Sequence, residues 1–185
     1  MDMRTAKEMD DYSLEKGFSA ADKSALKHFL LIEKQLKPDE NVKCAMTAFG
    51  VYNGQRAVMG GITAIAFTNM RLIYAQKGGF LFGEQVKIVN LNQVNDIEKA
   101  PFGIAYGRIS IDTIKENIGI DIDKKKIDAV FNAITEIIDD YKSASGVISQ
   151  PVSDAEELKK FKELFDSGVI TEEEYNKKKS QILGF

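Results

Sequence analysis

The sequence predicts a mainly β domain that is closed by one amphipathic helix and carries further helices at both ends. Short segments rich in strand-forming residues alternate with turn signals between residues 42 and 122, which is typical of a small antiparallel barrel or a bent sandwich. After residue 123 the apolar repeat changes from every second residue to a period of 3.6, which indicates a helix that covers the strands before it. A chain of 185 residues has room for one such domain and its appendages.

The N-terminal segment, residues 1–36, is predicted to be a helical extension. Residues 1–17 are charged and only weakly periodic, so we expect a frayed helix or disorder there. Ser19, with Asp22 three residues later, is predicted to cap a helix. Pro38 is expected to end that helix near Leu36, because the residue before a proline avoids helical geometry. The apolar stripe of this helix consists of Leu26, Phe29, Leu30 and Leu36.

The central hairpin of the predicted sheet turns at Thr68 and Asn69. An unbroken apolar run over residues 57–67 precedes this turn, and the strand formers of residues 72–75 follow it. Asn53 and the glycine after it mark a second hairpin turn, since this pair suits the positive φ of tight turns. Further strands are expected over residues 42–51, 82–90 and 106–111, with one that ends at Ala100 and a last one that carries Ile118, Ile120 and Ile122.

One apolar face defines the helix that follows the strands. Asp123 is predicted to cap this helix, which is expected to run to about residue 141. Such a wide apolar face must cover something, and we expect it to cover the open end of the strands just before it. The face consists of Ile127, Val130, Phe131, Ile134, Ile137, Ile138 and Tyr141.

The C-terminal part is predicted to be a linker followed by a helical hairpin. Residues 143–152 have the composition of a linker. They separate the β-rich domain, residues 37–142, from a tail at residues 153–185. Ser153 is expected to cap the first tail helix, and Thr171 opens the second through a capping box.

Composition narrows the classes of function. A net charge of −3 and a pI near 5.4 give no general attraction to phosphate backbones, so no nucleic-acid partner is expected. One cysteine and one histidine leave no cysteine metal cluster and argue against a histidine-based dyad, so we predict no metal, no cofactor and no catalytic residues. The sequence shows no transmembrane segment and no signal peptide, which predicts a cytoplasmic location.

The segment Thr68-Asn69-Met70-Arg71-Leu72-Ile73-Tyr74 resembles the TNxRLI signature of bacterial pleckstrin-homology (PH)-like domains. Residues 109–111 and the helix at 124–141 stand where that family places its sixth strand and its capping helix. The resemblance covers residues 36–141 and implies a seven-stranded antiparallel barrel capped by a C-terminal helix.

The tail resembles a second family, the short C-terminal (SHOCT) domain. The match lies in residues 164–175, which contain a glycine, two apolar residues, a threonine, three glutamates and a tyrosine, and in the lysines and leucine that follow. The resemblance implies a tail for oligomerisation or docking, on a PH-like core, with no enzyme activity. A chain of this kind suits a bacterium or its phage.

Three cations are candidates for binding a lipid headgroup, but they do not form a basic cluster. Arg56 follows the first hairpin turn, Arg71 stands in the signature, and Lys77 lies nearby in sequence. For Arg71 the simpler interpretation is a local ion pair or a solvent-exposed side chain. Among the remaining reactive groups, His28 is expected at the surface or at the boundary of the core, and Cys44 is expected to be buried and inert.

The apolar faces of the two appendages are the better candidates for function. A tail this short seldom folds alone, so its apolar residues must pack on the core, on a second copy or on another protein. We therefore predict a non-enzymatic module that forms a homo-oligomer or docks a protein partner through the C-terminal hairpin, with peripheral binding to anionic lipid as the alternative. The predicted contact residues are Leu158, Phe161, Leu164, Phe165, Ile170, Tyr175, Ile182, Leu183, Phe29 and Leu30.

Overall fold

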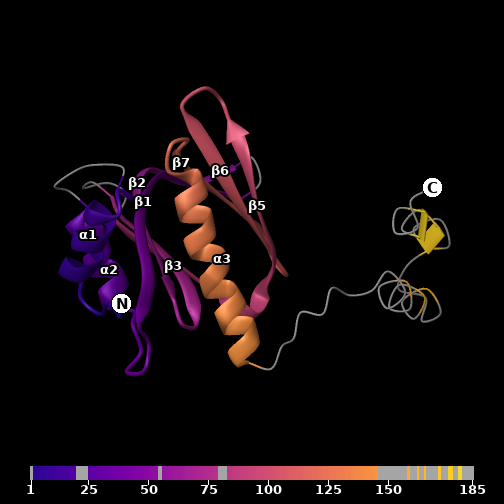
Figure 1. Ribbon diagram of the computed structural model, residues 1–185, viewed down its shortest axis with the longest axis horizontal. Helices are drawn as coiled ribbons and strands as arrows, with labels where there is room; N and C mark the ends of the chain where they lie inside the picture. Colours follow the sequence, from indigo (N-terminus) through magenta and orange to yellow (C-terminus); the bar gives the residue numbers. More distant parts are fainter. Residues whose placement is uncertain are drawn as a thin grey trace. The chain divides into compact units, whose positions relative to one another are not determined.

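A computed structural model of the protein describes residues 2–19, 25–53, 56–78 and 83–145, and single positions between residues 158 and 180. The chain divides into two units, Met1–Ala144 and Ser145–Phe185. In the first unit the described residues form a seven-stranded sheet and three α-helices (Figure 1). No helix within the described ranges is long and apolar enough to cross a bilayer.

The strands, the helix just before them and the helix after them follow one another in the order that the sequence predicts. The helices are α1 (Ala6–Glu15), α2 (Leu26–Glu33) and α3 (Ile127–Ala144), with a short 3-10 turn η1 (Leu91–Gln93). The strands are β1 (Val42–Asn53), β2 (Arg56–Thr68), β3 (Arg71–Lys77), β4 (Glu84–Asn90), β5 (Val94–Phe102), β6 (Tyr106–Thr113) and β7 (Asn117–Asp123).

All neighbouring strands are antiparallel, and β1 joins the two halves of the sheet. The strand order is β4-β3-β2-β1-β7-β6-β5. The last strand returns to the first, since Gly50 of β1 pairs with Asp121 of β7. Shifts of register on either side of Gly50 mark the part of β1 that changes from pairing with β2 alone to pairing with both neighbours. The predicted fold, seven antiparallel strands capped by a C-terminal helix, is confirmed.

The first core lies between the inner face of the sheet and α3. The predicted stripe of α3 is buried at Ile127, Val130, Ile134 and Ile138. Ile109 and Ile111 of the predicted strand β6 are fully buried in the same core. Asp123 does not cap α3 directly. Its carboxylate accepts the backbone N–H of Lys125 at 2.8 Å, in the turn before the helix begins.

A second core on the opposite face of β1–β3 was not predicted. The helices α1 and α2 cover this face, as Figure 1 shows. The strands present small side chains there, so the helices approach closely. The fully or almost fully buried residues of this core are Met3, Ala6, Met9, Ala25, Phe29, Leu31, Ile32, Val42, Ala45, Ala64, Ala66, Ile73 and Ala75.

The expectation of a frayed or disordered N-terminus is wrong. Thr5 and Glu8 form a capping box that starts α1. Met3 pairs with Val42 through two backbone hydrogen bonds of 3.1 and 2.9 Å, which adds the N-terminus to the sheet. The segment is charged, but Met3, Ala6 and Met9 are buried in the second core, whereas Leu14 is 55% exposed.

The predicted helix of the N-terminal extension is shorter than expected. It is α2, which begins at Leu26, so Ser19 does not cap it. The Ser19 hydroxyl instead lies 3.3 Å from that of Thr47 on β1. Phe29 is fully buried, so its assignment as a partner-contact residue is wrong, whereas Leu30 is exposed.

In the second unit, the described positions indicate two helical turns that meet. Leu158 and Phe165 are helical and half-buried, and so is Tyr175. The rings of Phe165 and Tyr175 stack with their centroids 5.4 Å apart. The predicted contact residues Phe161, Leu164, Ile170, Ile182 and Leu183 lie outside the described residues.

Candidate functional site

The signature segment between β2 and β3 holds its own hairpin turn and the loop before β1 together. We call Thr68, Asn69, Arg71 and their partner Glu40 the clamp. The Thr68 hydroxyl accepts the backbone N–H groups of Met70 and Arg71 at 3.0 and 2.8 Å, which fixes the hairpin turn. The Asn69 side chain accepts the N–H of Asn41 at 3.0 Å and donates to the carbonyl of Asp39 at 3.3 Å. The turn is thereby tied to the loop that enters β1.

Arg71 is a buried structural residue, so the hypothesis that it contacts a ligand is wrong. Its guanidinium donates to both carboxylate oxygens of Glu40, at 2.9 Å from Nε, and also to the carbonyl of Gln35 at 2.7 Å. Glu40 is fully buried and Arg71 is 8% exposed. The alternative interpretation is right only in that Arg71 forms an ion pair, because this pair is buried and its partner stands 31 positions away in sequence.

The contacts of Glu40 favour its ionised form. Burial raises the pKa of the Glu40 carboxyl. Hydrogen bonds from Arg71, from the backbone of Lys37 and from the Thr68 hydroxyl lower it by a larger amount, so the net pKa lies below the ordinary 4.5. The Thr68 hydroxyl donates at 2.7 Å. The carboxylate therefore neutralises the guanidinium and satisfies three separate donors in the same buried place.

The other two candidate cations do not create a headgroup pocket within the described residues. The side chain of Arg56 lies outside them. Lys77 pairs with Glu84 at 3.4 Å across β3 and β4. In the middle of β4, Lys87 pairs with Glu116 at 3.5 Å. Each of these described lysines faces a carboxylate, which offsets the charge that a phosphate needs.

The lone histidine and the lone cysteine are both buried. His28 is 3% exposed, so the expectation of a surface position is wrong. Its Nδ1 accepts the backbone N–H of Lys77 at 2.8 Å. Burial, with a smaller contribution from Lys27, lowers the pKa of His28. The imidazole is thus held neutral as a structural acceptor between α2 and β3.

Cys44 is expected to be unreactive in the folded protein. It is fully buried on β1, and burial raises the pKa of its thiol to about 12. A maleimide should therefore label it only after unfolding in denaturant, as measured by the mass increase of the intact chain. An Ile104→Cys variant, whose new thiol lies at an exposed position, should gain one label at once in the native state. Rapid native labelling of Cys44 would contradict its placement in the core.

Aromatic side chains gather on the outer face of the strands at the β5–β6 hairpin. We call Phe49, Tyr52, Phe102, Ile104 and Tyr106 the aromatic surface. The Phe49 and Tyr106 rings meet edge to face at 5.3 Å. Phe49 is 41% exposed and Phe102 is 44% exposed. Large exposed apolar patches on folded domains commonly mark interaction sites.

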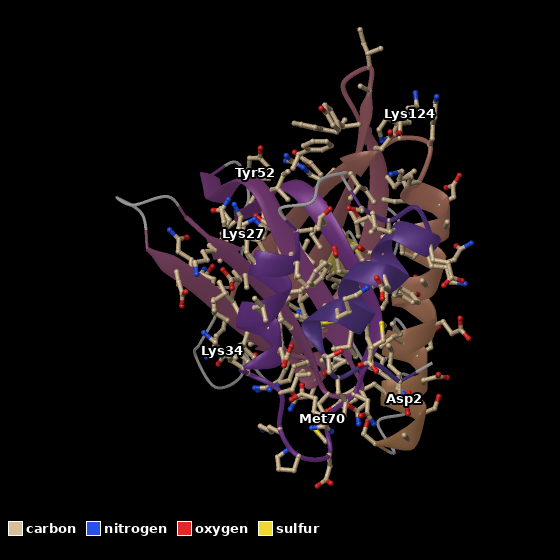
Figure 2. All side chains as sticks on the ribbon, turned by 90° about the vertical axis from the view of Figure 1, so that its left-hand side faces the viewer. Asp2, Lys27, Lys34, Tyr52, Met70 and Lys124 are labelled. Carbon is tan, nitrogen blue, oxygen red and sulfur yellow. The ribbon has the colours of Figure 1, made fainter. Side chains whose placement is uncertain are left out.

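An ion pair lies in the middle of the aromatic surface. Arg108 donates two hydrogen bonds to Asp121, at 2.6 and 2.8 Å. Its guanidinium also lies over the rings of Tyr52 and Phe102, 4.5 and 4.0 Å from their centroids. The hydrogen bonds to Asp121 raise the pKa of Arg108. This packing fixes the aromatic rings in place. Figure 2 shows Tyr52 in the same half of the unit as Lys124, away from Met70.

The aromatic surface is not predictable from local sequence patterns, because β1 contributes to it together with the distant hairpin β5–β6. Phe49 and Tyr52 are on β1, which reaches β5 and β6 only through β7. One local signal was present, since Phe102 and Tyr106 flank a glycine at a hairpin turn. Aromatic residues beside a tight turn at the end of two strands indicate an exposed tip.

A groove of about 550 Å³ lies between α1 and the C-terminal half of α3. It combines the apolar side chain of Ile137 with the carboxylates of Glu136 and Asp140. Lys43, on its wall, forms an ion pair with Asp2. The remaining lining residues are Tyr12, Asn69, Ala133, Tyr141 and Ala144. This mixed lining brings no nucleophile and base together.

Comparison with known families agrees with the fold. The family model of the bacterial PH domain matches residues 36–136, which is more than half of the chain. The chain belongs to the bacterial PH domain family. A second family model, the Short C-terminal domain (SHOCT), matches residues 156–183 of this bacterial PH protein. PH-like and SHOCT domains are typically non-catalytic interaction domains, which suggests a module for protein or lipid interaction.

Solved structures similar to this bacterial PH protein are distant. The hSac2 domain from human phosphoinositide phosphatase Sac2 is 14% identical, with a TM-score of 0.42 over 68% of this chain and 86% of that chain. Autoinhibited Vav1 is 8% identical, also with a TM-score of 0.42, over 80% of this chain and 24% of that chain. No curated protein matches the sequence. The family match begins at residue 36, so α1 and α2 lie outside it.

Proposed function

We propose that this bacterial PH protein is a non-enzymatic module that self-associates through its SHOCT-like tail. The observation that carries the proposal is the contrast between the two helical appendages. The apolar faces of the N-terminal helices already pack in the second core, which buries Phe29 and Ile32 completely. The tail forms a separate unit, Ser145–Phe185, close to the length of about 40 residues below which chains rarely fold alone.

The composition of the tail supports pairing with a second copy. Its described apolar residues Leu158, Phe165 and Tyr175 are only half-buried. Three glutamates at residues 172–174 precede three lysines at residues 177–179. A two-fold arrangement of antiparallel tails places the acidic segment of one copy beside the lysines of the other.

The mass in solution tests this proposal. We expect light scattering on a sizing column to give a multimer for the full chain and a monomer for a chain that stops after Ser145. In the full chain, Tyr175→Ser should weaken the assembly about tenfold or more, because it removes a ring that stacks on Phe165. Asn176→Ser changes an exposed neighbour and should leave the mass unchanged.

Two results would contradict the proposal. A monomeric full chain at high concentration excludes self-association altogether. If the full and the shortened chain form the same multimer, the contact between copies lies in the Met1–Ala144 unit, and the tail is free to dock another protein.

A further inference from the structure

The tip of the β5–β6 hairpin presents an isolated apolar side chain to solvent. The strands are joined by residues 103–105, with Phe102 and Tyr106 as the last pair. Gly103 has a φ of +67°, which only glycine adopts without strain, and this makes the turn tight. Ile104 is 97% exposed at the tip. Figure 1 shows the hairpin projecting beyond the start of α3.

The residues of the tip have the composition that a bilayer interface favours. Scattered exposed apolar residues are ordinary on a protein surface. Here, however, the apolar tip is flanked by two aromatic rings, since Phe102 is 44% and Tyr106 is 38% exposed. Aromatic residues settle at the headgroup level of a membrane, and an aliphatic residue beyond them reaches the acyl boundary.

A turn of three lysines lies against the hairpin tip. The backbone N–H of Lys124 donates to the carbonyl of Ala105 at 3.0 Å. Lys124 and Lys125 are exposed, and within the described residues neither forms an ion pair. Lys126 donates to the carbonyl of Ser19 at 2.8 Å. Figure 2 shows Lys124 beside the hairpin, at the opposite end of the unit from Met70.

The charges around this tip leave a positive excess. Arg108 is neutralised by Asp121, and Lys99 pairs with Asp128 at 2.6 Å. Asp123 is the one further carboxylate of the lysine turn, and it accepts the N–H of Lys125. The lysines also stand just before the N-terminus of α3, where the helix dipole disfavours cations. An anionic surface relieves this repulsion, although the chain as a whole carries a net charge of −3.

We propose that the β5–β6 tip is a membrane-contact site for a bilayer that contains anionic lipid. Ile104 enters the apolar boundary, Phe102 and Tyr106 lie among the headgroups, and Lys124 and Lys125 meet lipid phosphates. The site differs from strands β3 and β4, whose lysines Lys77 and Lys87 are paired with carboxylates. The proposal is independent of self-association by the tail.

Sedimentation with vesicles tests this contact. The full chain should bind vesicles of phosphatidylglycerol and phosphatidylcholine and should not bind phosphatidylcholine alone. Ile104→Asp should weaken partitioning about tenfold or more. Lys124→Ala and Lys125→Ala should each weaken it by roughly fivefold at low salt. The matched control is Ile114→Asp, because Ile114 is 69% exposed but follows the opposite end of β6.

A fluorescent probe locates the contact directly. The chain has no tryptophan, so Ile104→Trp introduces a single reporter at the tip. Its emission should shift to the blue with anionic vesicles, whereas that of Ile114→Trp should not. Circular dichroism of each variant should match the parent chain, since both side chains are exposed.

Three outcomes would overturn the membrane proposal. The first is no sedimentation of the full chain with anionic vesicles. The second is equal binding by the Ile104→Asp and parent chains, or equal shifts for the two tryptophan variants. The third is that Ile104→Asp changes the mass in solution without any vesicle binding, which would identify the tip as a protein contact.

Discussion

A chain that starts at residue 36, the first residue of the PH family match, is expected to be insoluble or largely unfolded. The deletion removes α1 and α2 and uncovers the alanine-rich face of β1–β3. Each large side chain lost from the second core contributes about 1.5–3 kcal/mol when buried. Several such losses approach the roughly 5–15 kcal/mol that stabilises a whole domain. Circular dichroism and urea unfolding of the two chains measure this effect.

Two controls separate loss of the core from the effect of shortening a chain. The chain that stops after Ser145 loses a separate unit and should keep the unfolding midpoint of the first unit. Within the full chain, Phe29→Ala should cost about 3–5 kcal/mol. Leu30→Ala, at a 45% exposed neighbour, should change stability by no more than about 0.5 kcal/mol. A stable chain from residue 36 would show that the second core is dispensable.

Breaking the buried clamp at Glu40 is expected to destabilise the protein by about 3–5 kcal/mol. Glu40→Ala leaves the Arg71 guanidinium buried without its counter-ion and removes one of the two acceptors of the Thr68 hydroxyl. The double variant Glu40→Leu with Arg71→Met removes both charges and should recover much of this loss. Urea unfolding at neutral pH gives the values. A single variant as stable as the parent would mean that the pair contributes nothing.

The same clamp predicts a dependence of stability on pH. Because the folded protein lowers the pKa of Glu40 below 4.5, its contribution is complete above the ordinary glutamate pKa. The contribution is lost as the pH falls through the lowered pKa. Glu40→Gln should lack this part of the pH dependence, so its deficit relative to the parent should shrink between about pH 6 and about pH 3. A constant deficit over that range would contradict the assignment.

Local patterns were sufficient to predict the fold of the β-rich domain. The turn at Thr68 and Asn69, the alternation of Ile118 and Ile120, and the stripe of α3 each depend on neighbours in sequence. The second core left a weaker signal. Helix α1 buries only Ala6, Met9 and Ser13, a stripe too narrow and too small to distinguish from a solvated helix.

One sequence feature did indicate two-sided burial. The apolar run over residues 57–67 does not alternate, which is typical of a strand covered on both faces. Ile65 packs in the first core, and Ala64 and Ala66 pack in the second. By contrast, the pairing of Glu40 with Arg71 and the meeting of Phe49 with Tyr106 depend on three-dimensional register. Spacing along the chain does not specify such contacts.

The order of strand pairing also constrains synthesis on the ribosome. Helices α1 and α2 and strands β1–β4 contact one another within the first 90 residues, so they have most of their partners early. The edge of β1 that pairs with β7 stays open until β7 has been synthesised, since Gly50 pairs with Asp121. At about 5–20 residues per second, that edge stays unpaired for several seconds. An open strand edge is a site for wrong pairing between nascent chains. Slow translation across β5 and β6 therefore prolongs the time during which this edge is open to aggregation.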